Sequence, residues 1–492
     1  MAALLAALMI VPPAGGAEPP AARSVNAAEQ RLPDLGDASE ITISPADEER
    51  LGREFMRQAR THLNVLDDPV LWSYLQRMGE HIAIEAGASE GEFYFFLVND
   101  NSFNAFAVPG GYVGVHTGLL MAAKTEAQLA SVLAHEIIHV RQRHIPRMIA
   151  EQKRVTGPAL LAMIAGVLLA SSGSNAGQAA VALTSAALTQ HQINFTRTFE
   201  EEADRLGMRA LTAAGYSAGA MPEMFEVMLQ QGRIYESDLP EYLRTHPVTT
   251  RRISEARDRA LGYKTAAGTD NTNLEHAQAR VRVITAPDSR SAVEWFRAER
   301  EAGRNGDTVR YGLALALTRA RDYKGAAREL DPLLAARPSY APYVIADAEN
   351  AISAGNLGAA LARYSGALAK NPDEPLLQRY YAEALLKAKQ PQAARNWLRS
   401  ALRSEPRDPE LYRSLSRAAG DAGNLAEAHQ AYAEYYYLNG ELPRAVEQLK
   451  LAERSAGSNT YYRESIATRI RAIEAEIKSE RGHGGDQAGS GR

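Results

Sequence analysis

A period of 34 residues runs through the second half of the chain. A proline recurs at this spacing, at Pro338, Pro372 and Pro406. Two sets of small residues keep the same period: Ala326, Ala360, Ala394 and Ala428, and Ala314, Ala348, Ala382 and Ser416. Small residues let two antiparallel helices approach closely, and a proline stops the second helix before the next repeat. This half is therefore predicted to stack pairs of helices into an extended array.

A period of 34 residues is that of tetratricopeptide repeats. We expect about four to five repeats between residues 291 and 480, with degenerate terminal repeats acting as caps. The predicted repeat domain, an α-solenoid, covers residues 291–481. The polar, repeat-free residues 264–290 before it are interpreted as a linker, and the Gly-rich residues 482–492 after it as a disordered tail.

The first half contains an HExxH motif formed by His135, Glu136 and His139. Residues four apart lie on one face of a helix, so both imidazoles can reach one cation while Glu136 reaches the water of that metal. A helix is predicted because a capping box starts at Thr125 and apolar residues follow at helical spacing until Pro146. The competing interpretation is a pair of hydrogen-bonded core histidines.

A zinc hydrolase needs three protein ligands and leaves the fourth position to water or substrate. Glu200 is the best third ligand, because it opens a predicted helical run in which Asp204 follows one turn later on the same face. Asp204 would accept the distal N–H of a ligand histidine and so fix its tautomer. The competing interpretation is a solvated acidic face at a helix N-terminus, which we prefer for Glu201 and Glu202.

An HExxH motif followed roughly 60 residues later by Glu-x-x-x-Asp resembles the glutamate-zincins of the CAAX-prenyl-protease and heat-shock-membrane-protease type. The similarity covers roughly residues 30–262. It implies one Zn²⁺ per chain, bound in a mostly helical α+β metallopeptidase domain with a small sheet, predicted at residues 44–263. Further motifs support it: the segment Asn104–Gly118, Thr196 with Arg197, and Thr245-His246-Pro247 followed by Arg252 and Ile253.

His246 has two functional interpretations. On its predicted loop it would either stabilise the oxyanion of the transition state or occupy the open metal position in a resting, autoinhibited enzyme. A helix-capping or hydrogen-bonded loop histidine is the third reading. His144 lies nine residues after His135, on the opposite helical face, and is interpreted as structural.

The predicted sheet contains a strand at residues 93–98 and a hairpin of residues 106–108 and 112–115 around Pro109-Gly-Gly111. Residues 112–115 are expected to be an edge to which an unfolded polypeptide can add as a strand. One helix is predicted to start at Ser44-Pro45, and a second to cover residues 68–86.

Residues 1–17 hold a short apolar run followed by prolines and small residues, which predicts a signal peptide cleaved near Ala17. No Lys or Arg precedes the run, so a flexible Ala-rich terminus is the competing interpretation. Residues 18–43 are expected to form an extended arm. A second apolar segment, residues 158–170, falls short of the roughly 20 residues of a membrane span and is interpreted as a cover of the active site, with contact to a membrane surface as a further reading.

The formal net charge of −4, without a basic tract, makes nucleic acid an unsuitable partner. The chain has no cysteine, which excludes disulfides, thiolate ligands and a cysteine nucleophile. Soluble glutamate-zincins with a C-terminal repeat array are periplasmic, and the resemblance implies the same location here.

Together these features predict an exported zinc endopeptidase with Glu136 as general base, and the resemblance implies that it acts in quality control or assembly of outer-membrane proteins. Its predicted partners are unfolded or misassembled proteins, and outer-membrane assembly machinery bound through the repeats. The alternative is a repeat-based chaperone or scaffold with a structural or vestigial zinc site. Glu136 favours the enzyme, because a closed structural site has no use for a general base.

Overall fold

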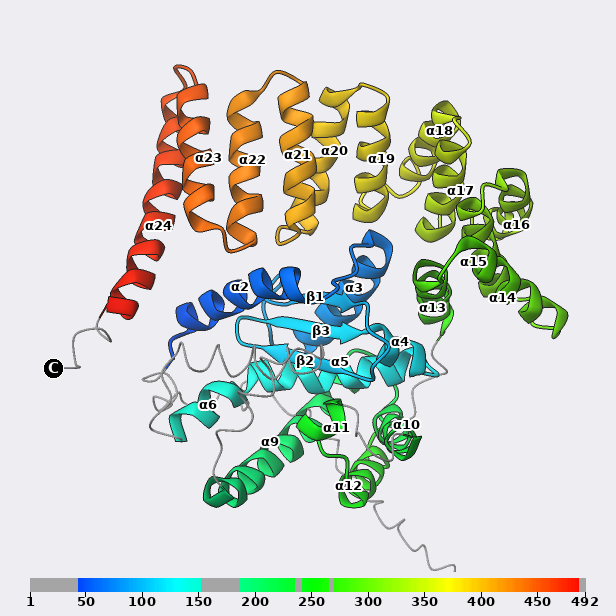
Figure 1. Ribbon diagram of the computed structural model, residues 1–492, viewed down its shortest axis with the longest axis vertical. Helices are drawn as coiled ribbons and strands as arrows, with labels where there is room; N and C mark the ends of the chain where they lie inside the picture. The colour runs from blue at the N-terminus through cyan, green and yellow to red at the C-terminus, as the bar shows by residue number, and fades with distance from the viewer. Residues whose placement is uncertain (1–42, 152–185, 235–240, 265–269, 486–492) are drawn as a thin grey trace, which may run out of the picture.

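The computed structural model describes residues 43–151, 186–234, 241–264 and 270–485. The predicted signal peptide and the apolar segment 158–170 lie outside these residues. Of the predicted arm at residues 18–43, only the last residue is described. Within them, no helix combines the length and the apolar character that a membrane crossing requires. The protease domain lies below an arch of repeat helices (Figure 1).

The sheet has three strands, β1 (Tyr94–Val98), β2 (Ala105–Val108) and β3 (Tyr112–His116), in the order β1-β3-β2. The predicted hairpin is confirmed, since β2 pairs with β3 in antiparallel register around Gly110 and Gly111, which adopt φ of +84° and +81°. The prediction that residues 112–115 form an edge is wrong: β1 pairs with the other side of β3, in parallel. Strand order depends on contacts distant in sequence, which local patterns do not contain.

The outer side of β1 is already occupied. The Gln76 side chain accepts a hydrogen bond from Phe95 N at 3.0 Å and donates to Phe93 O at 2.9 Å, as a neighbouring strand would. Further along β1, Leu66 N donates to Leu97 O at 2.8 Å. In the described part of the chain no segment hydrogen-bonds to the outer side of β2, so β2 is the open edge of this sheet.

Helices cover both faces of the sheet. Helix α2 (Pro45–His62) starts at a capping box of Ser44 and Asp47, as predicted, and packs Phe55 against Phe96 and Phe106 on one face. Helices α3 (Pro69–Glu85) and α5 (Glu126–Arg141) pack on the other face. The other helices among the described residues of the protease domain are α4 (Thr117–Ala122), α6 (His144–Glu151), α9 (Ala186–Ala213), α10 (Ala220–Ile234), α11 (Glu241–Thr245) and α12 (Thr250–Ala260).

The repeat array confirms the predicted α-solenoid. The first helices of four successive pairs begin at residues 307, 341, 375 and 409, at the predicted period. The helices are α15 (Asp307–Arg319), α16 (Tyr323–Ala336), α17 (Ala341–Ser353), α18 (Leu357–Leu368), α19 (Pro375–Lys387), α20 (Pro391–Ser404), α21 (Pro409–Asp421), α22 (Leu425–Leu438), α23 (Leu442–Ser455) and α24 (Thr460–Gly485). Ala326, Ala360 and Ala394 are fully buried between paired helices, which explains why a small residue recurs there.

The residues predicted to be a linker contain a helix. Helix α13 (Thr272–Thr285) precedes α14 (Ser289–Glu301), and its Leu274, Ala277 and Val281 belong to the protease core. This helix was not predicted, because α13 lacks the repeat pattern; its Ala279 and Val283 pack instead with the first repeat helices. Helix α24 also extends four residues into the predicted tail, to Gly485.

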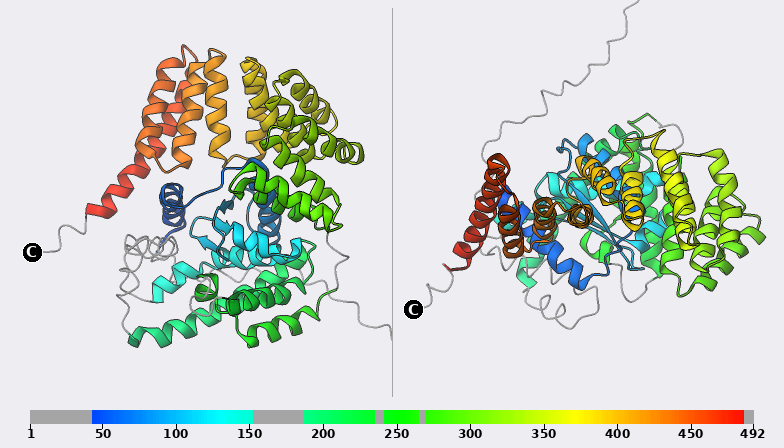
Figure 2. Two further views of the ribbon diagram at one scale, coloured as in Figure 1. Left: turned by 45° about the vertical axis from the view of Figure 1, so that its right-hand side comes forward. Right: turned by 90° about the horizontal axis from the view of Figure 1, so that it is seen from above.

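The two domains meet at a buried ion pair. Arg280 of α13 donates to Asp68 at 2.8 Å, and Asp68 also caps α3 by accepting from Val70 N at 3.1 Å. Val70 continues this contact into the repeats, where it packs with Ile345 and Leu377. A turned view shows the repeats on the α2 and α3 side of the protease, away from α9 and α12 (Figure 2). Asp68 therefore both caps α3 and binds the helix that leads into the repeats.

Replacing Arg280 with Met should lower the free energy of unfolding by about 3 kcal/mol, because it leaves the Asp68 carboxylate buried without its partner. Urea unfolding followed by circular dichroism measures the change. Arg297→Met, at an exposed position of α14, is the matched control and should stay within about 0.5 kcal/mol of the parent. Equal effects of the two substitutions would contradict the role of this ion pair.

Candidate metal centre

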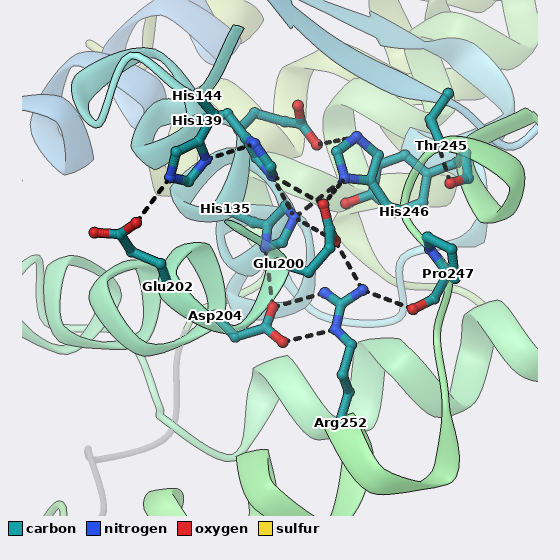
Figure 3. Close-up of polar contacts among 12 residues, drawn as sticks. His135, His139, His144, Glu200, Glu202, Asp204, Thr245, His246, Pro247 and Arg252 are labelled. Carbon is teal, nitrogen blue, oxygen red and sulfur yellow. Dashed lines mark hydrogen bonds and ion pairs between the residues drawn. The ribbon is translucent and has the colours of Figure 1, made fainter. Parts of the chain in front are cut away.

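Helices α5 and α9 bring the predicted ligand residues together (Figure 3). His135 and His139 project from α5, and Glu200 projects from α9 toward both. The helices approach closely at Gly207, where a Cβ atom would lie 3.3 Å from the backbone of Ala134 and of His135. A larger residue at this position would push α9 away from α5, and Glu200 with it.

The separations of the three side chains match a tetrahedral zinc site. His135 Nε2 lies 3.0 Å from His139 Nε2 and 3.3 Å from Glu200 Oε2. His139 Nε2 lies 3.3 Å from Glu200 Oε1. Ligand atoms bound tetrahedrally at zinc–nitrogen and zinc–oxygen lengths of about 2.0–2.1 Å are roughly 3.3 Å apart. Two imidazole nitrogens and the carboxylate of Glu200, which turns one oxygen toward each of them at this spacing, fit Zn²⁺ in both chemistry and size.

His246 lies at the fourth corner. Its Nδ1 is 2.9 Å from Glu200 Oε1 and 3.3 Å from His135 Nε2. One ligand atom from each of His135, His139, Glu200 and His246 can be chosen so that all four lie within 4.8 Å of one another. In this conformation, His246 faces the position that a zinc hydrolase leaves to water or substrate.

Glu136 lies beside this cluster and is almost fully buried, at 1% exposure. Its Oε1 forms no hydrogen bond within the described residues, and His246 Nε2 lies 3.7 Å from it. A buried carboxylate oxygen without a donor is costly unless a ligand or water satisfies it. The arrangement suits a carboxylate that receives a proton from a water molecule in the site.

Asp204 supports His135 from behind, with its Oδ1 3.0 Å from His135 Nδ1. A carboxylate at this distance from the distal ring nitrogen is the usual partner of a ligand histidine. Arg252 in turn holds Asp204 by two hydrogen bonds of 2.7 Å, from Nε and from Nη2. The role of Arg252 was not predicted, although its Arg-Ile motif was recognised after the Thr-His-Pro loop.

Arg252 also connects the ligand helix to the loop that carries His246. Its Nη1 lies 2.8 Å from Glu200 Oε2 and donates to Pro247 O at 2.9 Å. The ring of Tyr242 stacks on His246, with centroids 4.7 Å apart, and Phe103 meets Tyr242 edge-on at 6.2 Å. The position of His246 is therefore fixed by a guanidinium on one side and by aromatic rings on the other.

His144 is closer to the cluster than predicted. Its Nδ1 lies 2.9 Å from His139 Nδ1, and its Nε2 lies 3.2 Å from Glu202 Oε2. The prediction assumed one continuous helix, but α5 ends at Arg141 and Arg143 turns the chain with φ of 51°. The spacing rule for one continuous helix does not apply across this break, so His144 lies on the side of His139. Glu202 contacts His144 and is not part of a solvated acidic face as predicted.

The buried charges favour a cation at this position. Burial opposes ionisation of Glu200, yet the charges of His246 and His135 hold the pKa of its carboxyl well below its usual range. Burial alone would lower the pKa of His135, but the carboxylates of Glu200 and Asp204 raise it to about 10. For His139 the effect of burial dominates, and the pKa of this imidazole is lowered. Ionised carboxylates thus draw positive charge into the space between the imidazoles.

Asp204→Ala should weaken zinc binding by about 10- to 100-fold, because His135 loses the acceptor that fixes its ring and tautomer. Competition with a chromophoric zinc chelator measures the affinity. Glu201→Gln is the control, since Glu201 lies on the same helix and pairs with the exposed Arg251 instead. Unchanged zinc affinity in Asp204→Ala would show that the Asp204–His135 contact does not support metal binding.

Comparison with known families agrees with this geometry. The profile described as peptidase family M48 matches residues 71–260, and a tetratricopeptide repeat profile matches residues 351–419.

Three relatives illustrate the range of similarity. The β-barrel assembly-enhancing protease of Yersinia pestis is 33% identical over 91% of this chain and 92% of its own length. The putative β-barrel assembly-enhancing protease of Vibrio cholerae is 35% identical over 85% of this chain and 86% of its own. The mitochondrial metalloendopeptidase OMA1 of Schizosaccharomyces pombe is 30% identical over 38% of this chain and 52% of its own. Both halves of the chain thus have counterparts in the first two relatives.

Proposed function

Since this chain belongs to the family of β-barrel assembly-enhancing proteases and is a metalloendopeptidase, we propose that it cuts unfolded or misassembled outer-membrane proteins in the periplasm. The observation that carries the proposal is the convergence of His135, His139 and Glu200 at tetrahedral spacing beside the buried Glu136. The repeats would bring the enzyme to its substrates or to outer-membrane assembly machinery, through the extended surface that such arrays offer.

His135, His139 and Glu200 would hold one Zn²⁺, with Asp204 orienting His135. Bound zinc supplies a Lewis acid that polarises the scissile carbonyl and lowers the pKa of water in the site. Glu136 takes the proton of the attacking water and then delivers it to the leaving amine, so that the amine departs neutral. Its burial beside the cluster and its free Oε1 support this assignment.

The substrate would bind along β2. Because Gln76 and Leu66 occupy the outer side of β1, β2 is the edge to which an extended polypeptide can add. Such addition uses main-chain hydrogen bonds and selects weakly for side chains. Helix α5, with the HExxH motif, packs against β2 and β3, so a chain on this edge passes near Glu136.

His246 would keep the enzyme latent. Its Nδ1 faces the ligand cluster at 2.9 Å from Glu200, while its Nε2 lies 3.7 Å from Glu136. In that position it takes the place of water, and the Tyr242 ring stacked on it stabilises this conformation. The competing role, stabilising the oxyanion, requires His246 to leave the cluster when substrate binds.

The alternative of a scaffold with a structural zinc site receives less support. A structural site closes its coordination with four ligands and places no free carboxylate next to them. If His246 is a permanent fourth ligand, Glu136 would have no purpose at its buried position. Binding of partners by the repeats is compatible with the peptidase and does not replace it.

Glu136→Gln should retain zinc and lower casein hydrolysis by at least about 100-fold, because the amide cannot accept the proton of water. Metal content is measured by atomic absorption in parallel with release of labelled peptides. Glu201→Gln, an exposed substitution on α9, should keep both zinc and activity. A Glu136→Gln protein that holds zinc and still cuts casein would refute the assignment.

His246→Ala should raise basal casein hydrolysis severalfold, because the fourth position becomes open to water. Thr245→Ala, the adjacent residue at the end of α11, is the control for local disturbance of the backbone. A fall in hydrolysis with unchanged zinc content would instead assign His246 to the oxyanion. Measuring kcat and KM separately distinguishes the inhibitory role from the oxyanion role, since loss of a group that stabilises the oxyanion lowers kcat.

A further inference from the structure

A cavity of about 570 Å³ lies where the protease domain meets the first repeat helices. The residues before β2, with α4 and α10, form its protease side, and α13 and α14 form its repeat side (Figure 1). It is separate from the metal centre, since none of His135, His139, Glu200 and His246 lines it. The junction between the domains thus contains a space large enough for a few amino-acid residues.

The charge of this cavity is unlike that of its neighbours. Arg282 is the only charged residue among the described residues that line it. Three other cavities of the molecule are each lined by at least four carboxylates, which balance the arginines and lysines beside them. The cavity at Arg282 therefore carries an uncompensated positive charge.

The guanidinium of Arg282 has N–H donors that no described residue accepts. Its guanidinium carbon lies 3.9 Å from the centre of the Trp295 ring, and within the described residues it forms no hydrogen bond or ion pair. The carboxylate that acts on it, Glu299, is engaged by Arg304 at 2.7 Å. A guanidinium that lies over an aromatic ring keeps N–H groups at its edge, and these can pair with a carboxylate.

The remaining wall suits a polypeptide end. Met121, Ala122 and Ala286 offer apolar surface, and Trp295 is 36% exposed. The side chains of Asn101 and Gln231 can donate to and accept from a peptide group. A cavity that combines one cation, a pair of amides and an apolar wall fits a carboxylate attached to an apolar residue.

We propose that the Arg282 cavity binds the C-terminal carboxylate of a polypeptide whose last side chain is apolar. Arg282 pairs with the carboxylate, and the apolar wall receives the side chain. An endopeptidase produces a new C-terminus with each cut, so such ligands form wherever this enzyme acts. A phosphate-bearing ligand is less suitable, because one arginine balances a single charge and no second cation lines the cavity.

The bound terminus would lie two rings away from His246. Phe103 forms part of the cavity wall and also meets Tyr242 edge-on, and Tyr242 stacks on His246. These contacts are structural and do not depend on the catalytic assignment. Binding at Arg282 can therefore be measured without any hydrolysis.

The test uses the full-length chain with Glu136→Gln, so that the added peptide stays intact. N-acetylated Ala-Ala-Leu is titrated as the free acid and as the C-terminal amide, and affinity is measured by calorimetry. The free acid should bind at least about tenfold more tightly than the amide, because only the acid offers a charged partner to Arg282. Equal affinities, or no binding of either peptide at millimolar concentration, would overturn the proposal.

Variants locate the binding. Arg282→Gln should weaken binding of the free acid by at least about tenfold, and Arg282→Lys should weaken it less, since the charge remains. Arg297→Gln, on the same α14 helix as Trp295 but outside the cavity, should leave the affinity unchanged. Retained affinity in Arg282→Gln would refute the site. Inorganic phosphate that displaces the peptide at equal concentration would show an unselective anion site and would also refute it.

If Arg282→Gln unfolds, Trp295→Leu provides a second variant. It keeps the charge and removes the ring on which the guanidinium lies, so the free acid should bind more weakly while thermal unfolding stays near that of the parent. Unchanged affinity in this variant, together with an unfolded Arg282→Gln protein, would reject the proposed geometry.

Discussion

The close packing of α9 on α5 is the constraint on which the candidate metal centre depends. HExxH supplies two imidazoles from a single helix, but the third ligand must come from a helix that starts roughly 50 residues later. Gly207 lets the two backbones approach, and this approach brings Glu200 to the histidines and Asp204 to the back of His135. Arg252 then pairs with both carboxylates, which offsets part of the cost of burying their charges together.

The sequence was sufficient for features that repeat or that have fixed spacing. The 34-residue period predicted the helix pairs, because every repeat buries the same small residues. HExxH and Glu-x-x-x-Asp predicted which side chains would meet, because each motif lies on one helical face. The hairpin around Gly110 and Gly111 followed from turn residues that tolerate positive φ.

The errors arose where distant contacts decide the structure. A left-handed residue at Arg143 returns His144 to the cluster, and a helix-face argument cannot anticipate such a break. The central position of β3 follows from parallel pairing with β1, which leaves no local signal. Helix α13 carries no repeat pattern because it packs on two sides, against the protease core and against the first repeat helices. Arg252 was visible as part of a motif, but its partners on α9 were not.

The closure of one sheet edge by Gln76 has a consequence for selectivity. A polypeptide that adds to β2 must bring main-chain N–H and C=O groups that are not yet engaged. In a completed barrel, the main-chain groups of each strand already form hydrogen bonds with the neighbouring strands, so such a strand cannot pair with β2. An enzyme built this way would tell a finished barrel from an unfinished one without reading any side chain, by whether backbone groups remain to be satisfied.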